Sequence, residues 1–219
     1  EMRNVRAWLF AGAILSVVVP AAADAITAGQ SCEKAASDAL RSCVGQIGKL
    51  EQKCYRGTGA ACSSTDPKLV KQIDRVASRV LARCPDQATL HGGGRGVAAR
   101  SYGGPHAAAR AGAFPTDQKC LDAAWKEGAS LLDYGLRQQS TCIRNTKAGR
   151  PCNTVDLASK LATRENTATS RIAGKCVTPL ATLVAIDPAT FSARTAEQSR
   201  CLVATAHGDP TPLTLDCGP

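Results

Sequence analysis

The sequence predicts an all-α protein built from two disulfide-stapled, antiparallel helical hairpins. Three observations lead to this class. The 219-residue chain contains eleven cysteines, and eight of them form two sets with nearly equal spacing. The residues that flank the two sets match, which indicates an internal duplication. The segments between the cysteines carry apolar residues three and four positions apart, which is the spacing of one helical face.

The N-terminal residues 1–25 have the pattern of a secretory signal peptide. Two arginines precede an apolar run over 7–19, and a series of small residues follows it. This order is typical of an export signal, cleaved here after Ala25 or, alternatively, after Ala23. All the cysteines lie beyond that point, and cysteines of exported proteins are usually oxidised. We therefore expect a secreted or periplasmic protein of the bacterial envelope, with no membrane span after cleavage.

The duplication is defined by the cysteine sets. The first set is Cys32, Cys54, Cys62 and Cys84, and the second is Cys120, Cys142, Cys152 and Cys176. The intervals are 22, 8 and 22 residues in the first set and 22, 10 and 24 in the second. The stretches CYRGTGA and CIRNTKA begin at matching cysteines. We expect one hairpin over 26–85 and a second over 117–177.

Each long interval predicts one helix. The first has an apolar seam at Ala36, Leu40, Cys43, Ile47, Leu50 and Cys54. The second has Leu69, Ile73, Val76 and Val80, after a start marked by Thr65 or Asp66 as the cap and Pro67 as the first helical residue. In the second copy the seams are Leu121, Ala124, Gly128, Leu131 and Gly135, then Leu157, Leu161, Ala168 and Ile172.

Helix geometry predicts how the cysteines pair. A step of 22 residues is about 33 Å long and turns by only about 40°, so both cysteines of one helix face the partner helix. In an antiparallel hairpin the inner cysteines meet at the turn and the outer ones meet at the open end. The predicted pairs are Cys32–Cys84, Cys54–Cys62, Cys120–Cys176 and Cys142–Cys152. Loop closure of this kind stabilises a fold by about 4 kcal/mol for 32–84 and about 2.5 kcal/mol for 54–62.

Three cysteines remain. Cys43 corresponds to Leu131 in the second copy, which favours a buried free thiol in the core. The alternative is a partner elsewhere in this chain or in another. Cys201 and Cys217 are expected to pair and to tie the C-terminal segment, 178–219, to a short helix over about 195–207. Thr195 and Gln198 have the spacing of a capping box for that helix.

Residues 86–116 are rich in glycine and alanine and predict a flexible linker. Whether the two hairpins pack on each other stays open at this point. The sequence predicts neither an enzyme nor a cofactor or metal site. His91-Gly-Gly-Gly resembles an esterase oxyanion loop but lacks a Gly-x-Ser-x-Gly nucleophile, and the three histidines have no metal-ligand spacing.

Basic side chains form one stripe beside the apolar seam in each copy. The stripe of the first copy contains Lys68, Lys71, Arg75, Arg79 and Arg83, and that of the second contains Lys160, Arg164, Arg171 and Lys175. One interpretation is a solvated face that keeps the helices soluble. The other is a site for an anionic polymer, which the net charge of +9 would favour. Arg56 and Arg144, in matching loops, are expected to bond helix-end carbonyls.

The chain resembles exported bacterial proteins that are built from repeated cysteine-bounded helical hairpins. The resemblance covers residues 32–84 and 120–217, and it rests on an export signal followed by the order cysteine, helix, cysteine, loop, cysteine, helix, cysteine. The resemblance implies a surface or spacer module and no particular activity. We therefore expect a non-enzymatic structural or protein-interaction module. The alternative is a basic module that binds an anionic envelope polymer or nucleic acid, and a remoter one is a thiol redox or metal-handling protein.

Overall fold

The computed structural model describes residues 28–58, 62–63, 65–84, 117–207 and 211–213. The predicted signal peptide, the predicted linker over 86–116 and Cys217 lie outside the described residues. Within the described residues the structure is all-α and contains no strand. The predicted fold class is therefore confirmed.

The first hairpin pairs one long helical rod with α3. The rod consists of α1 (Ala28–Ser42), a π-helical turn η1 (Cys43–Ile47) and α2 (Gly48–Thr58), and α3 spans Pro67–Leu81. Asp66 caps α3, since its Oδ1 accepts hydrogen bonds from the amides of Lys68 (2.8 Å) and Leu69 (3.0 Å). This confirms the predicted cap and the proline at the first helical position. A small apolar cluster formed by Ala39, Leu69 and Val76 joins the two helices.

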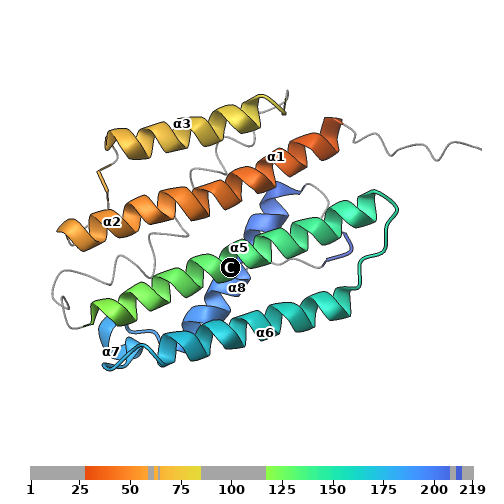
Figure 1. The fold of residues 1–219 in the computed structure, drawn as a ribbon. Coiled ribbons are helices and arrows are strands. Elements are labelled where there is room, and N and C mark those ends of the chain that lie inside the picture. Colours follow the sequence, from red (N-terminus) through yellow and green to blue (C-terminus); the bar gives the residue numbers. More distant parts are fainter. Residues whose placement is uncertain (1–27, 59–61, 64, 85–116, 208–210, 214–219) are drawn as a thin grey trace, which may run out of the picture.

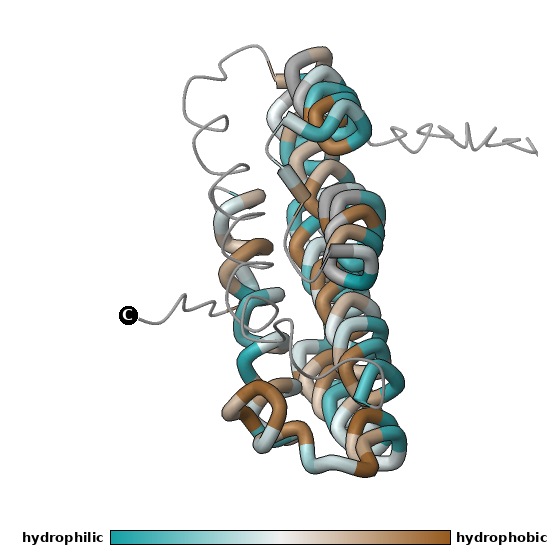
Figure 2. Tube along the Cα trace, turned by 90° about the vertical axis from the view of Figure 1, so that its left-hand side faces the viewer, coloured by the Kyte–Doolittle hydropathy of each residue, from teal (hydrophilic) through white to brown (hydrophobic). Residues whose placement is uncertain are grey.

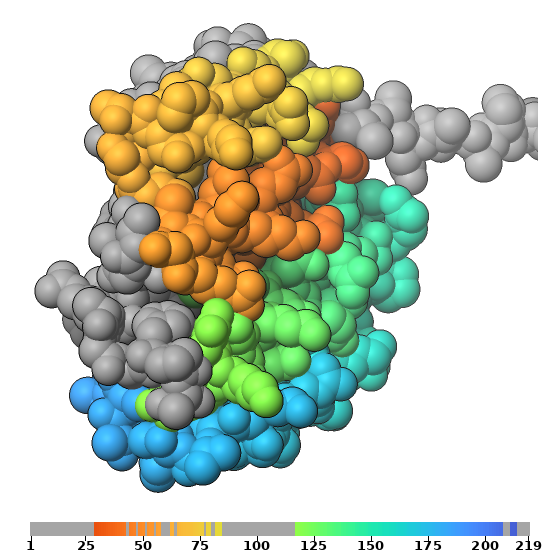
Figure 3. All heavy atoms as spheres, turned by 60° about the vertical axis from the view of Figure 1, so that its left-hand side comes forward, coloured from red at the N-terminus to blue at the C-terminus, as the bar shows by residue number. Residues whose placement is uncertain are grey.

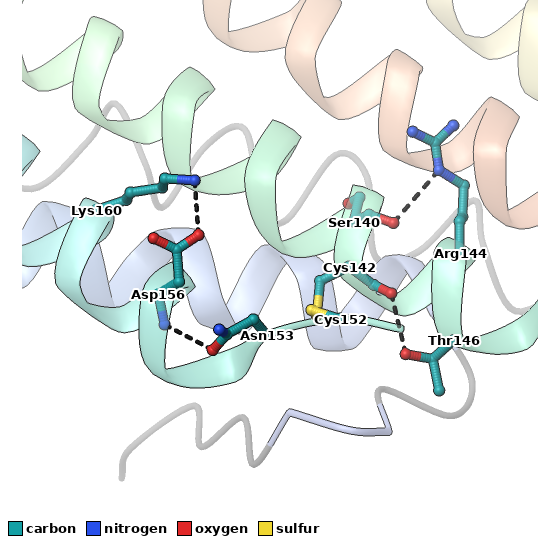
Figure 4. The surroundings of a disulfide bond; sticks show 8 residues. All are labelled: Ser140, Cys142, Arg144, Thr146, Cys152, Asn153, Asp156 and Lys160. Atoms are coloured by element: carbon teal, nitrogen blue, oxygen red, sulfur yellow. Dashed lines mark hydrogen bonds and ion pairs between the residues drawn. A yellow bond between two sulfur atoms is a disulfide. The ribbon is translucent and has the colours of Figure 1, made fainter. Parts of the chain in front are cut away.

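The second hairpin consists of α5 (Gln118–Lys147) and α6 (Thr154–Ala173). Asn153 begins α6, because its side chain accepts a hydrogen bond from the amide of Asp156 at 3.0 Å. The turn between the helices is closed by the Cys142–Cys152 disulfide, directly beside this cap (Figure 4). The two-residue insertion in the second copy therefore lengthens the loop without changing how its cysteines pair.

All four predicted hairpin disulfides are present. They are Cys32–Cys84, Cys54–Cys62, Cys120–Cys176 and Cys142–Cys152. Cys201 is also disulfide-bonded, whereas its predicted partner Cys217 lies outside the described residues. The prediction of a buried free thiol concerns the side chain of Cys43, which lies outside the described set. Leu131, its counterpart in the second copy, is buried as expected of a core position.

The C-terminal segment corrects one prediction. It holds a short helix α7 (Leu180–Val184) and a long helix α8 (Pro188–Ala206), not one short helix over 195–207. Asp187 caps α8 by accepting from the amides of residues 189 and 190, and Pro188 occupies its first turn. Thr195 is not a cap: it is buried inside the helix, and its hydroxyl donates to the carbonyl of Phe191 at 2.8 Å.

The two hairpins pack on each other, which answers the question that the sequence left open. Helix α3, the α1–α2 rod, α5 and α6 lie side by side in that order, and α8 crosses behind α5 (Figure 1). Seen end-on, the hairpin helices form a stack with α8 beside it (Figure 2). The shared core contains Ala36, Leu40, Val44, Leu132, Leu136, Ile143, Leu202, Val203 and Ala206. Part of the predicted seam of the first hairpin thus faces the second hairpin.

The α1–α2 rod runs antiparallel to α5, and polar contacts between the two follow the length of this interface. Arg41 Nε lies 2.8 Å from Asp133 Oδ1 near the middle of the rod. Ser37 and Ser140 share a buried hydroxyl–hydroxyl hydrogen bond of 2.8 Å. On the other side of α5, Gly135 allows α8 to approach closely, since a Cβ there would lie 2.7 Å from Cβ of Ser199.

Candidate anion-binding face

Helix α3 presents its basic stripe at the edge of the molecule. The helix packs mainly on α1 and η1, and its outer surface lies open in the space-filling view (Figure 3). Every predicted cation of this stripe is exposed: Lys68, Lys71, Arg75, Arg79 and Arg83. We call these five residues the α3 face. Arg83 lies in the turn that follows the helix and extends the face toward the Cys32–Cys84 disulfide.

The charges of the α3 face are not neutralised by neighbours. Within the described part of the chain, none of its five cations makes an ion pair. Asp74 is the one carboxylate within α3, and at about 100° per residue it lies outside the arc of the basic side chains. At 1.5 Å per residue, the positions from 68 to 79 span about 16 Å. The result is a straight row of free cations.

The corresponding stripe of α6 is used differently. Arg164 Nη2 donates to Ser130 Oγ at 2.6 Å and lies 3.5 Å from Glu127 Oε2. Arg171 approaches the same carboxylate at 3.4 Å. Lys160 lies 2.7 Å from Asp156 (Figure 4), and the hydrogen bond to that carboxylate raises the lysine pKa. Lys175 is exposed. Two of the four cations, Arg164 and Arg171, therefore link α6 to α5, and Lys160 is paired within α6.

Glu127 explains the difference between the two copies. Its side chain is buried on the face of α5 that contacts α6. The corresponding residue of the first copy is Ala39, which packs against Leu69 and Val76 of α3. The first hairpin therefore lacks the buried carboxylate that pairs with the arginines of the second. Sequence reasoning missed this role of Glu127, although an acid inside an apolar seam was the signal for it.

The two matching arginines behave differently from each other. Arg144 Nε donates to the carbonyl of Ser140 at 3.3 Å, one turn earlier in α5 and not at the helix end (Figure 4). The expectation for Arg56 is wrong, because its Nε donates to Asp122 Oδ1 at 2.9 Å. Since α2 lies beside the start of α5, a carboxylate is within reach, and it is a stronger acceptor than a carbonyl.

A groove of about 250 Å³ lies between α5, α6 and α8. Its lining is mostly apolar and includes Leu131, Leu157 and Leu161. The buried amide of Gln139 lines it as well, with Nε2 donating to Ser199 Oγ at 3.0 Å and to the carbonyl of Gly135 at 3.1 Å. The bond to Ser199 ties α5 to α8, so the amide of Gln139 serves the packing of these helices.

The described side chains contain no group of three or more histidine, cysteine or acidic residues arranged to bind a metal ion. In the same part of the chain, no helix combines the length and apolarity needed to cross a bilayer. We found no protein-family model, no curated protein and no solved structure that matches this chain. The resemblance to exported hairpin proteins therefore stays a prediction.

Proposed function

We propose that this protein is a secreted, non-enzymatic binding module that holds an anionic polymer on its α3 face. The observation that carries the proposal is the contrast between the two copies. The α3 cations are exposed and free of ion pairs in the described structure, whereas most of their α6 counterparts are paired with carboxylates. A face kept only for solubility would not need five cations in one row.

The rest of the fold supports a binding role outside the cell. The four hairpin disulfides fix helices whose cores are small, and such bonds persist in oxidising compartments. The Cys54–Cys62 and Cys32–Cys84 bonds close the two ends of the first hairpin. The cations between them therefore sit on a helix whose two ends are both held by disulfides, which lowers the entropic cost of binding a long ligand.

A polymer held by such a row should bind with a steep dependence on salt. Each neutralised charge of the polymer releases condensed counterions, and the logarithm of the affinity falls with the logarithm of the salt concentration. If all five cations are engaged, a single-stranded polyanion gives a slope of about −3.5. The measurement is the affinity for dextran sulfate and for single-stranded DNA between low and high salt.

The test compares two triple variants with the same change in net charge. The first replaces Lys68, Arg75 and Arg79 by glutamine on the α3 face. The control replaces the exposed Lys126, Lys160 and Lys175 by glutamine on the second hairpin. We expect the first variant to lose most of the slope and the control to keep it.

Three results would contradict the proposal. Equal losses in both variants would mean that net charge alone drives binding. Affinity that is independent of salt, or no binding at low salt, would exclude a polyanion site. The α3 face would then be a solvated surface, and the protein would be a structural or protein-interaction module.

A further inference from the structure

A buried histidine links the first hairpin to the rest of the molecule. His207 follows α8 directly, and its side chain is fully buried. Its Nδ1 lies 3.0 Å from Glu33 Oε2 in α1. The other oxygen of Glu33 accepts a hydrogen bond of 2.6 Å from Lys147, the last residue of α5. Three segments that are distant in the sequence thus meet in one cluster.

The cluster is built for a neutral imidazole. When Nδ1 carries the hydrogen and donates to Glu33, the other ring nitrogen is a neutral acceptor, which costs less to bury without a partner than a charged donor does. That nitrogen, Nε2, is buried and has no hydrogen-bond partner among the described residues. A proton added there would be a buried donor without an acceptor, which is costly.

Burial of the ring is the main factor that opposes its protonation. Glu33 contributes one negative charge, and Lys147 already shares it. Burial lowers the pKa of His207; Glu33 raises it, and the positive charges of Lys147 and Arg144 lower it further. The net direction is downward from the usual value, so the closed cluster binds a proton less readily than an exposed histidine does.

The cluster lies at one end of the interface between the α1–α2 rod and α5, so a change in it acts on that end alone. It lies at the N-terminal end of the α1–α2 rod, while Arg56 and Asp122 pair at the opposite end. Arg41 and Asp133 pair between the two. Arginine and aspartate do not ordinarily titrate between pH 5 and 8. Among the described residues, the end with His207 therefore carries an imidazole, whereas the other two ion pairs along this interface join arginine to aspartate.

We propose that His207, Glu33 and Lys147 form an acid-sensitive latch that holds the start of α1 against the ends of α5 and α8. Above the usual histidine pKa of about 6.5, the latch is closed at full strength. As pH falls from about 6.5 toward the lowered pKa of the closed state, only the open state takes up the proton, so opening becomes favourable. The contact of α1 with the ends of α5 and α8 then opens at this end, while the arginine–aspartate pairs hold the rest of the α1–α2 rod on α5.

The size of the effect follows from the same linkage. If the closed state takes up no proton in this range and the open state has the usual pKa, the opening constant rises about tenfold between pH 7.5 and 5.5. The measurement is amide hydrogen exchange of the disulfide-bonded full chain at these two pH values, corrected for the intrinsic exchange rate. We expect the increase in the first turns of α1 and the last turn of α8, and no increase in α6.

A matched pair of variants assigns the effect to this side chain. His207→Asn places an amide donor near the Nδ1 position and cannot titrate, so it should abolish the increase. The double variant His91→Asn/His106→Asn removes the other two histidines of the chain and should leave it intact. An unchanged pH response in His207→Asn, or an equal increase in every helix, would overturn the latch.

A second measurement needs no variant. The imidazole resonances of the wild-type protein report the pKa of each histidine directly. His207 should titrate below the other two histidines. A His207 pKa at or above 6.5 would refute the proposal even if every variant failed to fold.

Discussion

The close approach of α5 and α8 makes a sharp prediction at Gly135. A Cβ built at this position would lie 2.7 Å from Cβ of Ser199, and closer still to its hydroxyl oxygen. Real side chains do not tolerate such a separation, so Gly135→Ala must push α8 away from α5. The displacement would also strain the hydrogen bond that Gln139 of α5 donates to Ser199 of α8.

The magnitude follows from two opposing terms. Overpacking of a buried contact costs about 1–3 kcal/mol. Alanine in place of glycine inside a helix returns about 0.5–1 kcal/mol. The net expectation for Gly135→Ala is a loss of about 0–2.5 kcal/mol in the free energy of unfolding.

The assay is urea unfolding at pH 7.5 with the disulfides intact. Gly45→Ala is the matched control, because a Cβ there meets nothing within 4 Å, and it should stabilise the protein slightly. Adding Ser199→Gly to Gly135→Ala removes the hydroxymethyl group that the new methyl group would meet, and should recover part of the loss although it also removes the acceptor for Gln139. The packing argument fails if Gly135→Ala stabilises the protein as much as Gly45→Ala does.

Three further predictions use the same assay. Glu127→Ala removes the carboxylate that faces half-buried Arg164 and should lower the free energy of unfolding by about 1–3 kcal/mol. A loss under about 0.5 kcal/mol would mean that this ion pair does not stabilise the fold. Replacing Cys54 and Cys62 together by serine removes a disulfide that joins residues eight positions apart, and should lower the free energy of unfolding by about 2.5 kcal/mol. An unchanged free energy of unfolding would contradict this prediction. Asp66→Ala removes the acceptor for two amides of α3 and should lower the free energy of unfolding by about 1 kcal/mol. The control is Asp66→Asn, which keeps an acceptor oxygen and should retain most of the stability of the cap.

Covalent and local features of this fold were predictable from the sequence. The cysteine spacing fixed the pairs because a helix has a constant rise and turn, so cysteines 22 residues apart stay on one face. The start of α3 was predictable because Asp66 and Pro67 act through neighbouring backbone atoms. An acidic cap followed by proline also marks the start of α8, at Asp187 and Pro188. The sequence prediction placed the cap at Thr195 instead, eight residues after Asp187.

Contacts between distant segments were not predictable in this way. That Arg56 binds a carboxylate depends on α2 lying beside the start of α5, which no local pattern encodes. The same holds for Glu33 and His207, which meet across 174 positions of the chain. The sequence predicted one basic stripe on each of α3 and α6, but only the structure shows that the α6 stripe has carboxylates beside it and that the described surroundings of the α3 stripe form no ion pair with it.

This difference follows from where each copy sits in the molecule. Helix α6 packs against both α5 and α8, so its polar residues lie close to the buried acid of α5 and are drawn into ion pairs. Helix α3 packs mainly on the α1–α2 rod, whose matching position is Ala39. Ala39 contacts α3 through apolar packing alone, so it offers the arginines of α3 no carboxylate to pair with. The second hairpin thus uses two arginines in ion pairs with the buried acid of α5, whereas the cations of α3 stay exposed.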